Sequence, residues 1–250
     1  MKPKEKMTLD RVLSRLGHAS RTTAREAIQA GRLRVNGRVV RDPECWINPG
    51  RDSVLFDGRP IKPARKIYLL FYKPKGVITS HGDPAGRKTI YDYLGALGEE
   101  GKWVAPVGRL DKDTSGLLLL TNDTGFADFV TSLESEVPKT YLAKISGLMS
   151  EATVAQLEAG VEMKRGDWAR PLSVRRLEDR GKYTWLEIVL TEGKNREVRR
   201  MIETVGFKVL KLVRTRIGAL SLEGLEVGKW RALTGAELNA FRRRRRAAHV

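Results

Sequence analysis

The sequence has a single cysteine, three histidines and no long apolar run. Cys45 alone excludes an internal disulfide and a metal site built from cysteines. No uninterrupted apolar stretch approaches the roughly 18 residues of a membrane-spanning helix. The charged start MKPKEKMTLDR is not followed by the apolar core of a secretory signal. The histidines are not spaced with a cysteine as metal ligands are. These absences predict a cytoplasmic protein with no membrane span and no bound metal.

Positive charge is abundant. The 250 residues include 47 Lys and Arg against 30 Asp and Glu, which gives a net charge of +17. The first 66 residues alone carry 16 basic and seven acidic side chains. Such a surface attracts polyanions and releases their counterions on binding. Charge by itself does not distinguish RNA from DNA or from an acidic membrane.

Residues 1–62 have the pattern of a small domain with two helices and a hairpin. Apolar residues recur at helical spacing from Leu9 to Leu16, and Ser20 is suited to cap a second helix that ends at Gly31. Two alternating segments then flank Asn36-Gly37, a strong signal for a tight hairpin. The chain therefore predicts a compact α/β domain at its N-terminus.

Both the helical part and the hairpin of this predicted domain carry arginines. Arg21 and Arg25 lie on the second helix, and Arg34 lies in the hairpin. They are suited to contact a phosphate backbone, although an ordinary solvated surface is the alternative. Residues 8–40 resemble the S-four-type (alpha-L) RNA-binding domain. This resemblance implies docking onto structured RNA through shape and phosphates.

Residues 63–250 predict a second domain with irregularly interleaved strands and helices. Strands are expected near 103–107, 116–121, 139–146, 183–190 and 207–213, and helices near 89–97, 124–132, 150–159, 195–205 and 234–244. This order favours a mixed, largely antiparallel sheet, so the whole chain is assigned to the α+β class. The run Arg242–Arg246 is either a solvated helix end or an RNA-binding tail.

A polar loop at residues 109–115 leads directly into an apolar strand. Asp111 and Asp113 lie in this loop beside Arg109 and Lys112. A nearby cation favours the ionised carboxylate, and an ionised, positioned aspartate can act as a nucleophile or a general base. The residues leave a second interpretation open, in which both aspartates only cap the turn.

Three further segments carry candidate functional residues. Tyr141 lies in a predicted strand, where a ring belongs to the core or stacks on a base lifted from RNA. The segment 192–201 carries several basic residues: Lys194, Arg196, Arg199 and Arg200. Helical spacing points Arg199 away from Arg196 and Arg200, so one arginine is expected to turn inward to a buried carboxylate while others hold phosphates.

Lys73 and Lys139 are further candidate phosphate contacts, and Leu212 is a candidate for an apolar side chain in the wall of the site.

These motifs together resemble the RsuA/RluB-type family of ribosomal RNA pseudouridine synthases. The matching segments, in the family's order, are YKPKGV (72–77), GRLDKDTSGLLLLTND (108–123), the Lys-Thr-Tyr of 139–141, EGKNREVRRM (192–201) and LVRTRIGALSL (212–222). The resemblance covers essentially the whole chain. It implies that residues 63–250 form a pseudouridine synthase domain.

The resemblance also assigns roles to individual residues. It implies that Asp111 is the catalytic aspartate, that Tyr141 stacks on the base and that Arg199 pairs with the aspartate. Leu212 corresponds to the apolar residue beside the aspartate and the base, and Arg109 to the arginine that helps to hold the flipped nucleotide. The reaction detaches uracil, rotates it and rejoins it through carbon 5. Since no group is imported and no oxidation occurs, no cofactor is expected. The acylal and glycal routes both remain open.

The expected substrate is a uridine in ribosomal RNA. The segment 79–94 favours the 23S large-subunit branch, with 16S small-subunit RNA as the alternative. A non-catalytic RNA-binding factor for ribosome assembly is the main competing hypothesis, and ribosomal assembly intermediates are further candidate partners. Nothing in the sequence requires more than a monomer.

Overall fold

The computed structural model describes residues 6–62, 64–98, 104–163 and 166–247. The chain divides into two compact units. The first comprises residues 1–68 with 97–105 and 120–126, and the second comprises 69–96, 106–119 and 127–250. Residue 63, where the sequence places the start of the second domain, lies outside the described residues. In these ranges, no helix is both long enough and apolar enough to cross a membrane.

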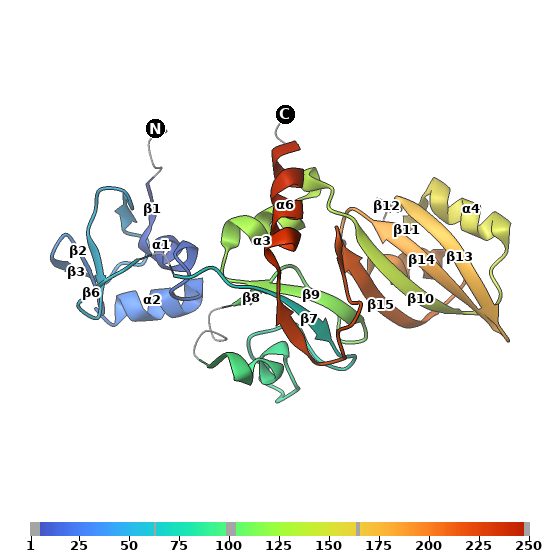
Figure 1. Ribbon diagram of the computed structural model, residues 1–250, viewed down its shortest axis with the longest axis horizontal. Helices are drawn as coiled ribbons and strands as arrows, with labels where there is room; N and C mark the ends of the chain where they lie inside the picture. Colours follow the sequence, from blue (N-terminus) through green and yellow to red (C-terminus); the bar gives the residue numbers. More distant parts are fainter. Residues whose placement is uncertain (1–5, 63, 99–103, 164–165, 248–250) are drawn as a thin grey trace. The chain divides into compact units, whose positions relative to one another are not determined.

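The first unit contains the predicted pair of helices and the hairpin (Figure 1). Its helices are α1 (Leu9–Arg15) and α2 (Arg21–Gln29). Its four-stranded sheet has the order β3 (Arg38–Val40), β2 (Leu33–Val35), β5 (Val54–Phe56), β6 (Arg59–Pro60). A separate pair joins β1 (Met7–Thr8) to β4 (Trp46–Ile47).

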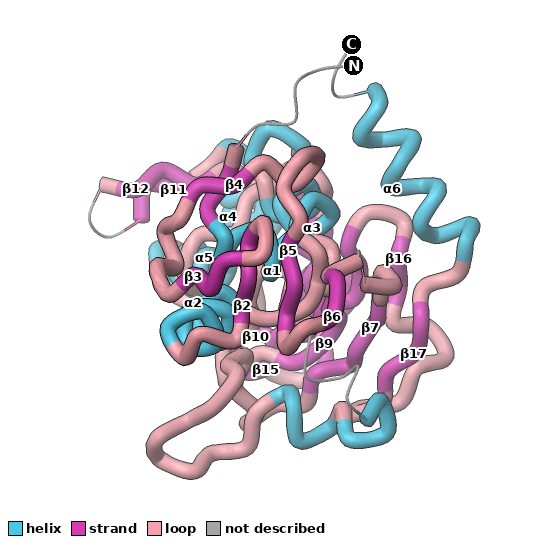
Figure 2. Tube along the Cα trace, turned by 90° about the vertical axis from the view of Figure 1, so that its left-hand side faces the viewer, coloured by secondary structure: helices cyan, strands magenta, loops and turns pink. Residues whose placement is uncertain are grey.

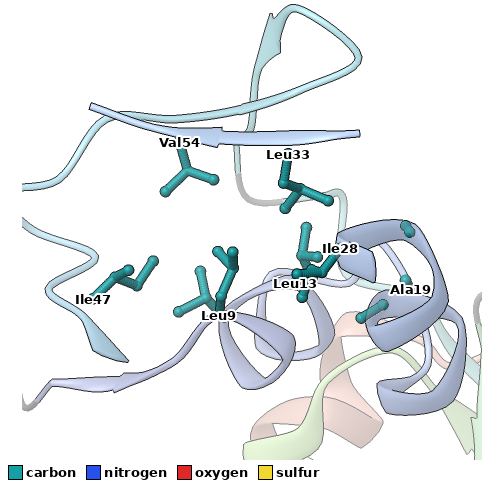
Figure 3. Close-up of a cluster of buried hydrophobic side chains, with 10 residues drawn as sticks. Leu9, Leu13, Ala19, Ile28, Leu33, Ile47 and Val54 are labelled. Atoms are coloured by element: carbon teal, nitrogen blue, oxygen red, sulfur yellow. The ribbon is translucent and has the colours of Figure 1, made fainter. Parts of the chain in front are cut away.

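Local sequence signals explain these elements. The Ser20 hydroxyl accepts a hydrogen bond from the Thr23 N–H at 3.1 Å and so caps α2. Asn36 and Gly37 have φ values of 49° and 82°, the positive angles that a two-residue hairpin of this type requires. Figure 3 shows Leu9, Leu13 and Ile28 facing the sheet, where they form one buried cluster with residues that include Leu33. The helices are therefore held by apolar burial against the sheet.

Most of a nine-stranded sheet belongs to the second unit. Seven strands follow the order β13 (Ser173–Arg180), β14 (Tyr183–Leu190), β10 (Lys139–Ser146), β15 (Val209–Ile217), β9 (Ser115–Thr121), β7 (Tyr68–Lys73), β17 (Trp230–Ala232). The short strands β8 (Ala105–Pro106) and β16 (Leu220–Ser221) pair with β9 and β15. The β15–β9 pair is parallel, whereas β10 pairs antiparallel with both β14 and β15. The predicted mixed, largely antiparallel sheet is confirmed.

Helices and a hairpin complete this unit. The helices are α3 (Thr124–Thr131), α4 (Glu151–Ala159), α5 (Glu197–Thr204) and α6 (Gly235–Ala247), and the hairpin joins β11 (Val161–Met163) to β12 (Asp167–Ala169). Figure 2 shows α6 as the last helix before the C-terminus. It includes the arginine run at 242–246 that the sequence left as a helix end or a tail.

Two sequence expectations differ from the structure. The helix expected at 89–97 is instead formed by 3-10 turns at Ile90–Tyr93 and 95–98. Leu94 separates the two turns and Gly95 begins the second one, and glycine is a poor helix former. Strand β13 was not predicted, because its sequence SVRRLEDR is mostly exposed at the edge of the sheet and does not show a clean alternation.

Gly116 allows the parallel strands β9 and β15 to approach each other closely. It pairs with Arg214 and has a φ of 119°. A Cβ atom added there would lie 2.3 Å from the Arg214 carbonyl oxygen. A larger residue would therefore push the strands apart, in addition to the cost of the positive φ.

We expect Gly116→Ala to lower the free energy of unfolding by about 3 kcal/mol or more, since the backbone of β15 must move. Urea denaturation measures this change. Gly82→Ala is the matched control, because a Cβ at Gly82 meets nothing within 4 Å, and we expect it to shift stability by less than about 0.5 kcal/mol. Equal stability of the two variants would contradict the close approach.

Candidate active site

A cavity of about 470 Å³ lies within the second unit. Five segments line it: the loop around 107–114, the end of α3 with the residues up to Leu133, β10, the segment 190–198 that leads into α5, and β15. Strands β10 and β15 are hydrogen-bonded neighbours (Figure 1). The cavity therefore lies where the polar loop before β9 meets the centre of the sheet.

The cavity brings together most of the candidate residues of the second domain. Seven of them line it: Arg109, Asp111, Lys139, Tyr141, Lys194, Arg196 and Leu212. Lys73 and Arg199 are buried and bind the backbone of the loop that carries Asp111. Arg21, Arg25 and Arg34 belong to the first unit. Segments more than 100 residues apart in the sequence thus form one site.

Asp111 is half-buried on the cavity wall. In the described part of the chain, no ion pair or hydrogen bond engages its carboxylate, although its backbone carbonyl is held. Arg199 donates to the Asp113 carbonyl and to the Val209 carbonyl, each at 3.0 Å. The inward arginine is therefore Arg199, but its hydrogen bonds go to backbone carbonyls. Burial lowers the pKa of its guanidinium, while the charges of Asp113 and Asp111 act in the opposite direction.

Lys73 has no exposed surface, and its ammonium group holds the same loop. The Nζ atom donates to the carbonyls of Pro74, Asp111 and Thr114 at 3.1, 3.0 and 2.8 Å. Burial lowers its pKa to about 8, and the charges of Asp111 and Asp113 limit the shift. The prediction that Lys73 contacts a phosphate is wrong, because all three ammonium hydrogens are used inside the protein.

The remaining carbonyls of the loop are also engaged. The Thr79 hydroxyl donates to the Leu110 carbonyl at 2.8 Å, and the Gly76 N–H donates to the Lys112 carbonyl at 2.8 Å. Together with Lys73 and Arg199, these bonds engage each carbonyl from residue 110 to residue 114. The backbone at Asp111 is therefore held firmly while its carboxylate stays available.

Two cations lie on the cavity wall beside Tyr141. Lys139 is buried and donates to the Thr191 carbonyl at 2.7 Å. Burial lowers its pKa to about 8, and the charge of Arg214 adds to this effect. Arg214 lines the cavity but was missed in the sequence analysis. The alternation of β15 was the available signal, since Arg214 follows Leu212 by two residues and so faces the same side.

Two glutamates lie at the entry to α5. Glu197 is buried, its Oε2 atom accepts from the Lys194 N–H at 2.9 Å, and its side chain is hydrogen-bonded to the Glu192 carboxyl. Burial raises the pKa of Glu197 to about 8, and the neighbouring Glu192 carboxyl adds to the shift. Glu197 is thus protonated at neutral pH, which avoids burying a second negative charge.

The outer part of the cavity is basic. Arg196 is exposed and precedes α5 with a φ of 49°. Lys194 is exposed and donates to the Trp168 carbonyl at 2.7 Å. Arg109 is also exposed. Lys194 also forms an ion pair with Glu192 at 2.9 Å. Among the described residues, Arg109 and Arg196 have no such partner, so these two side chains are open to an anion outside the cavity.

The arginines of the first unit have a role that the sequence did not suggest. Arg21 and Arg25 both bind the fully buried Asp10 carboxylate, at 3.0 and 3.1 Å. Burial alone would raise the pKa of Asp10, but hydrogen bonds from Thr8, Arg25 and Arg21 lower it to about 2. Both side chains remain accessible, with 58% and 43% of their surface exposed, and Arg25 also pairs with Glu44 at 2.9 Å. Arg34 is exposed as well.

No metal site is evident. Among residues 6–62, 64–98, 104–163 and 166–247, no group of three or more His, Cys, Asp and Glu side chains could hold an ion.

Comparison with known proteins gives a consistent result. The family model described as RNA pseudouridylate synthase matches residues 67–204, and the S4 domain model matches residues 7–45. An RNA pseudouridine synthase from Aquifex aeolicus (strain VF5) is 41% identical over 92% of this chain and 91% of its own. The ribosomal large subunit pseudouridine synthase B of Bacillus subtilis (strain 168) is 38% identical over 94% and 95%.

The fold agrees with this likeness. A crystal structure of a pseudouridylate synthase superposes with a TM-score of 0.69 and 27% identity, over 94% of this chain and 99% of that one.

We expect Glu197→Gln to change how stability depends on pH. An unfolded glutamate loses its proton near 4.5, whereas folded Glu197 keeps it to about 8. The stability contributed by the neutral carboxyl is therefore complete below about 4.5 and is lost as the pH rises through 8. Glutamine stays neutral, so the variant gains stability relative to the wild type between pH 5 and 8. Urea denaturation at both pH values tests this, with exposed Glu203→Gln as the control. A Glu197→Gln variant with the wild-type pH dependence would contradict the assignment.

Proposed function

The chain belongs to the RNA pseudouridylate synthase family, and from this premise we propose that it isomerises a uridine of 23S large-subunit ribosomal RNA to pseudouridine, with Asp111 as the catalytic carboxylate. The name of the Bacillus subtilis relative supports the large-subunit target. Small-subunit 16S RNA is the alternative substrate. The observation that carries the proposal is a half-buried aspartate on the wall of a cavity that also contains Tyr141 and Leu212. No residue that the structure describes pairs with its carboxylate.

The cavity suits a nucleotide turned out of its helix. Uracil within folded RNA is inaccessible, so the nucleotide must be flipped before any chemistry occurs. We propose that Tyr141 packs on the uracil face and that Leu212 contacts the base beside the aspartate. Asp111 then attacks C1′ of the ribose or removes the proton from C2′. Both routes cleave the bond from C1′ to N1, and both end with a new bond from C1′ to C5.

The held backbone supports this role for Asp111. A reacting group misplaced by about 1 Å can lose roughly a hundredfold in rate. Lys73 and Arg199 hold the loop through its carbonyls. We propose that they are positioning residues, with Arg199 acting through the Asp113 backbone and through its charge.

The basic groups divide into two proposed RNA contacts. In the second unit, Arg109, Lys194 and Arg196 hold phosphates outside the cavity, while Lys139 acts from its wall. In the first unit, Arg21, Arg25 and Arg34 contact the backbone of structured RNA, and Asp10 orients the first two. We propose that residues 1–62 serve as the RNA-binding domain and residues 63–250 as the catalytic domain.

The remaining features follow from the reaction. Because the isomerisation imports no atoms and transfers no net electrons, we propose that it requires no cofactor or metal. The candidate catalytic residues Asp111, Tyr141 and Leu212 line one cavity within a single chain, so the proposed chemistry needs no second copy, and we propose that a monomer is active. Free ribosomal RNA and ribosomal assembly intermediates in the cytoplasm are the proposed partners.

We expect Asp111→Asn to lower pseudouridine formation by roughly 10³-fold or more, because the amide is neither a nucleophile nor a base. RNA affinity should stay within about threefold of the wild type. Mapping pseudouridines in ribosomal RNA treated with each protein measures the first effect and identifies the uridine. An active Asp111→Asn variant would exclude the catalytic role, and an inactive wild type on both ribosomal RNAs would exclude the proposed function.

We expect Arg34→Gln to weaken RNA binding for all sequences and to reduce the slope of log affinity against log salt by about 0.7–1, the loss of one phosphate contact. Arg34 is the cleanest choice, because Arg21 and Arg25 also neutralise Asp10. Titrations at several salt concentrations measure the slope. If Arg34→Gln keeps the wild-type slope, this side chain does not contact a phosphate.

A further inference from the structure

We propose that Arg214 donates a hydrogen bond to a carbonyl oxygen of the target uracil and stabilises the negative charge that the ring gains when it leaves the ribose. The assignment depends on the proposed function, because it identifies a contact to the substrate of that site. It adds a residue to the cavity that the sequence motifs did not suggest.

Sheet register places Arg214 beside the other candidate residues. On β15 it lies directly opposite Tyr141 of β10, and on its other side it pairs with Gly116 of β9. Directly paired residues of neighbouring strands face the same side of a sheet. The register of β10 and β15 shifts next to this pair, between Thr140 and Tyr141, and such irregularities re-aim side chains near active sites.

The electrostatic surroundings of Arg214 are unusual for a buried cation. Only 5% of the residue is exposed. Its Nε atom donates to the Leu117 carbonyl at 2.8 Å, whereas Nη2 is buried without a partner. Within the described residues, no carboxylate forms an ion pair with it. A buried donor nitrogen that lacks an acceptor is costly, so a ligand that supplies an acceptor for Nη2 is favoured.

The neighbouring charges also favour an electron-rich group here. Lys73 and Lys139 are both buried, and the positive charge of Arg214 contributes to their lowered pKa values. The protein therefore places three cations close together near the inner wall of the cavity. An oxygen that becomes negative during the reaction would relieve this repulsion.

A uracil oxygen fits this position better than a phosphate. Apolar side chains line the cavity beside Arg214, among them Leu190, Leu212 and Ile217. A flat base can pack on such walls, whereas a phosphate would lose its hydration there. The exposed cations Arg109, Lys194 and Arg196 are better placed for phosphates, because they remain in contact with solvent.

The charge balance of the reaction gives Arg214 its role. When the C1′–N1 bond breaks, its electron pair moves to the uracil ring and spreads onto the two carbonyl oxygens. When the C1′–C5 bond forms, a pair from the ring makes the new bond, C5 loses its proton and N1 gains one. Arg214 stays protonated throughout and donates only a hydrogen bond, most strongly to the anionic ring.

We expect Arg214→Lys and Arg214→Gln to lower the single-turnover rate by about 10²–10³-fold, as removal of one donor to a developing oxyanion does. The dissociation constant for large-subunit ribosomal RNA should change by less than about threefold. Arg216→Gln is the matched control, because Arg216 lies on the same strand but is exposed, and it should keep the wild-type rate. Thermal unfolding verifies that each variant is folded.

A chemical probe tests the same contact in the wild-type enzyme, even if Arg214→Gln fails to fold. RNA carrying 2-thiouridine or 4-thiouridine at the modified position replaces one uracil oxygen by sulfur, a weaker acceptor. We expect one of the two to slow the wild type at least tenfold and to cause little further loss in Arg214→Lys. A purely structural role would leave the thio effect equal in both proteins.

Three results would overturn the assignment while the proposed function still held. The first is that folded Arg214 variants react at the wild-type rate. The second is that the wild type converts both thio substrates at the normal rate. The third is that the variants lose RNA affinity and show a smaller dependence of affinity on salt, while their rate at saturating RNA is unchanged. The last result would indicate a phosphate contact. A wild type that forms no pseudouridine would instead refute the proposed function, and this contact with it.

Discussion

The active-site geometry depends on a buried ammonium group that bonds only to backbone carbonyls. Lys73 ends strand β7, and its Nζ atom reaches the carbonyls of Asp111 and Thr114 in the loop before β9. The buried charge is costly, and its hydrogen bonds offset that cost only while the loop keeps this conformation. The hydrogen bonds to Lys73 therefore favour this conformation of the loop, and the same conformation places the Asp111 side chain at the cavity.

The cavity wall carries polar groups that the protein itself does not pair. Asp111 has no cation bound to its carboxylate in the residues that the structure describes. Nη2 of Arg214 is buried and also lacks a partner. Such groups reduce the stability of the empty protein. They are useful in an enzyme whose substrate gains charge in the transition state, because preorganised groups need not give up bonds to the protein before they bind it.

Much of the fold could be predicted from local signals. Asn36-Gly37 predicted the hairpin, and Ser20 predicted the start of α2, because turn and cap chemistry depend on neighbouring residues. The motifs also indicated which side chains would gather, since Asp111, Tyr141 and Leu212 do line one cavity. Their catalytic roles remain predictions.

Features that depend on distant partners could not be predicted in the same way. Lysine is rarely buried, so nothing near Lys73 in the sequence indicated that it would solvate a loop almost 40 residues away. Asp10 resembled any helical acid until Arg21 and Arg25 were seen to converge on it. Arg214 was missed because a strand arginine is usually exposed, and only the register with Tyr141 places it inside.

The most direct measurement is the single-turnover rate of pseudouridine formation by Lys73→Met, with exposed Lys75→Met as the control. If the buried ammonium positions Asp111, the folded Lys73→Met protein will bind ribosomal RNA with the wild-type affinity but react roughly a hundredfold or more slowly. The control will keep the wild-type rate. A folded Lys73→Met protein that reacts as fast as the wild type would contradict the account.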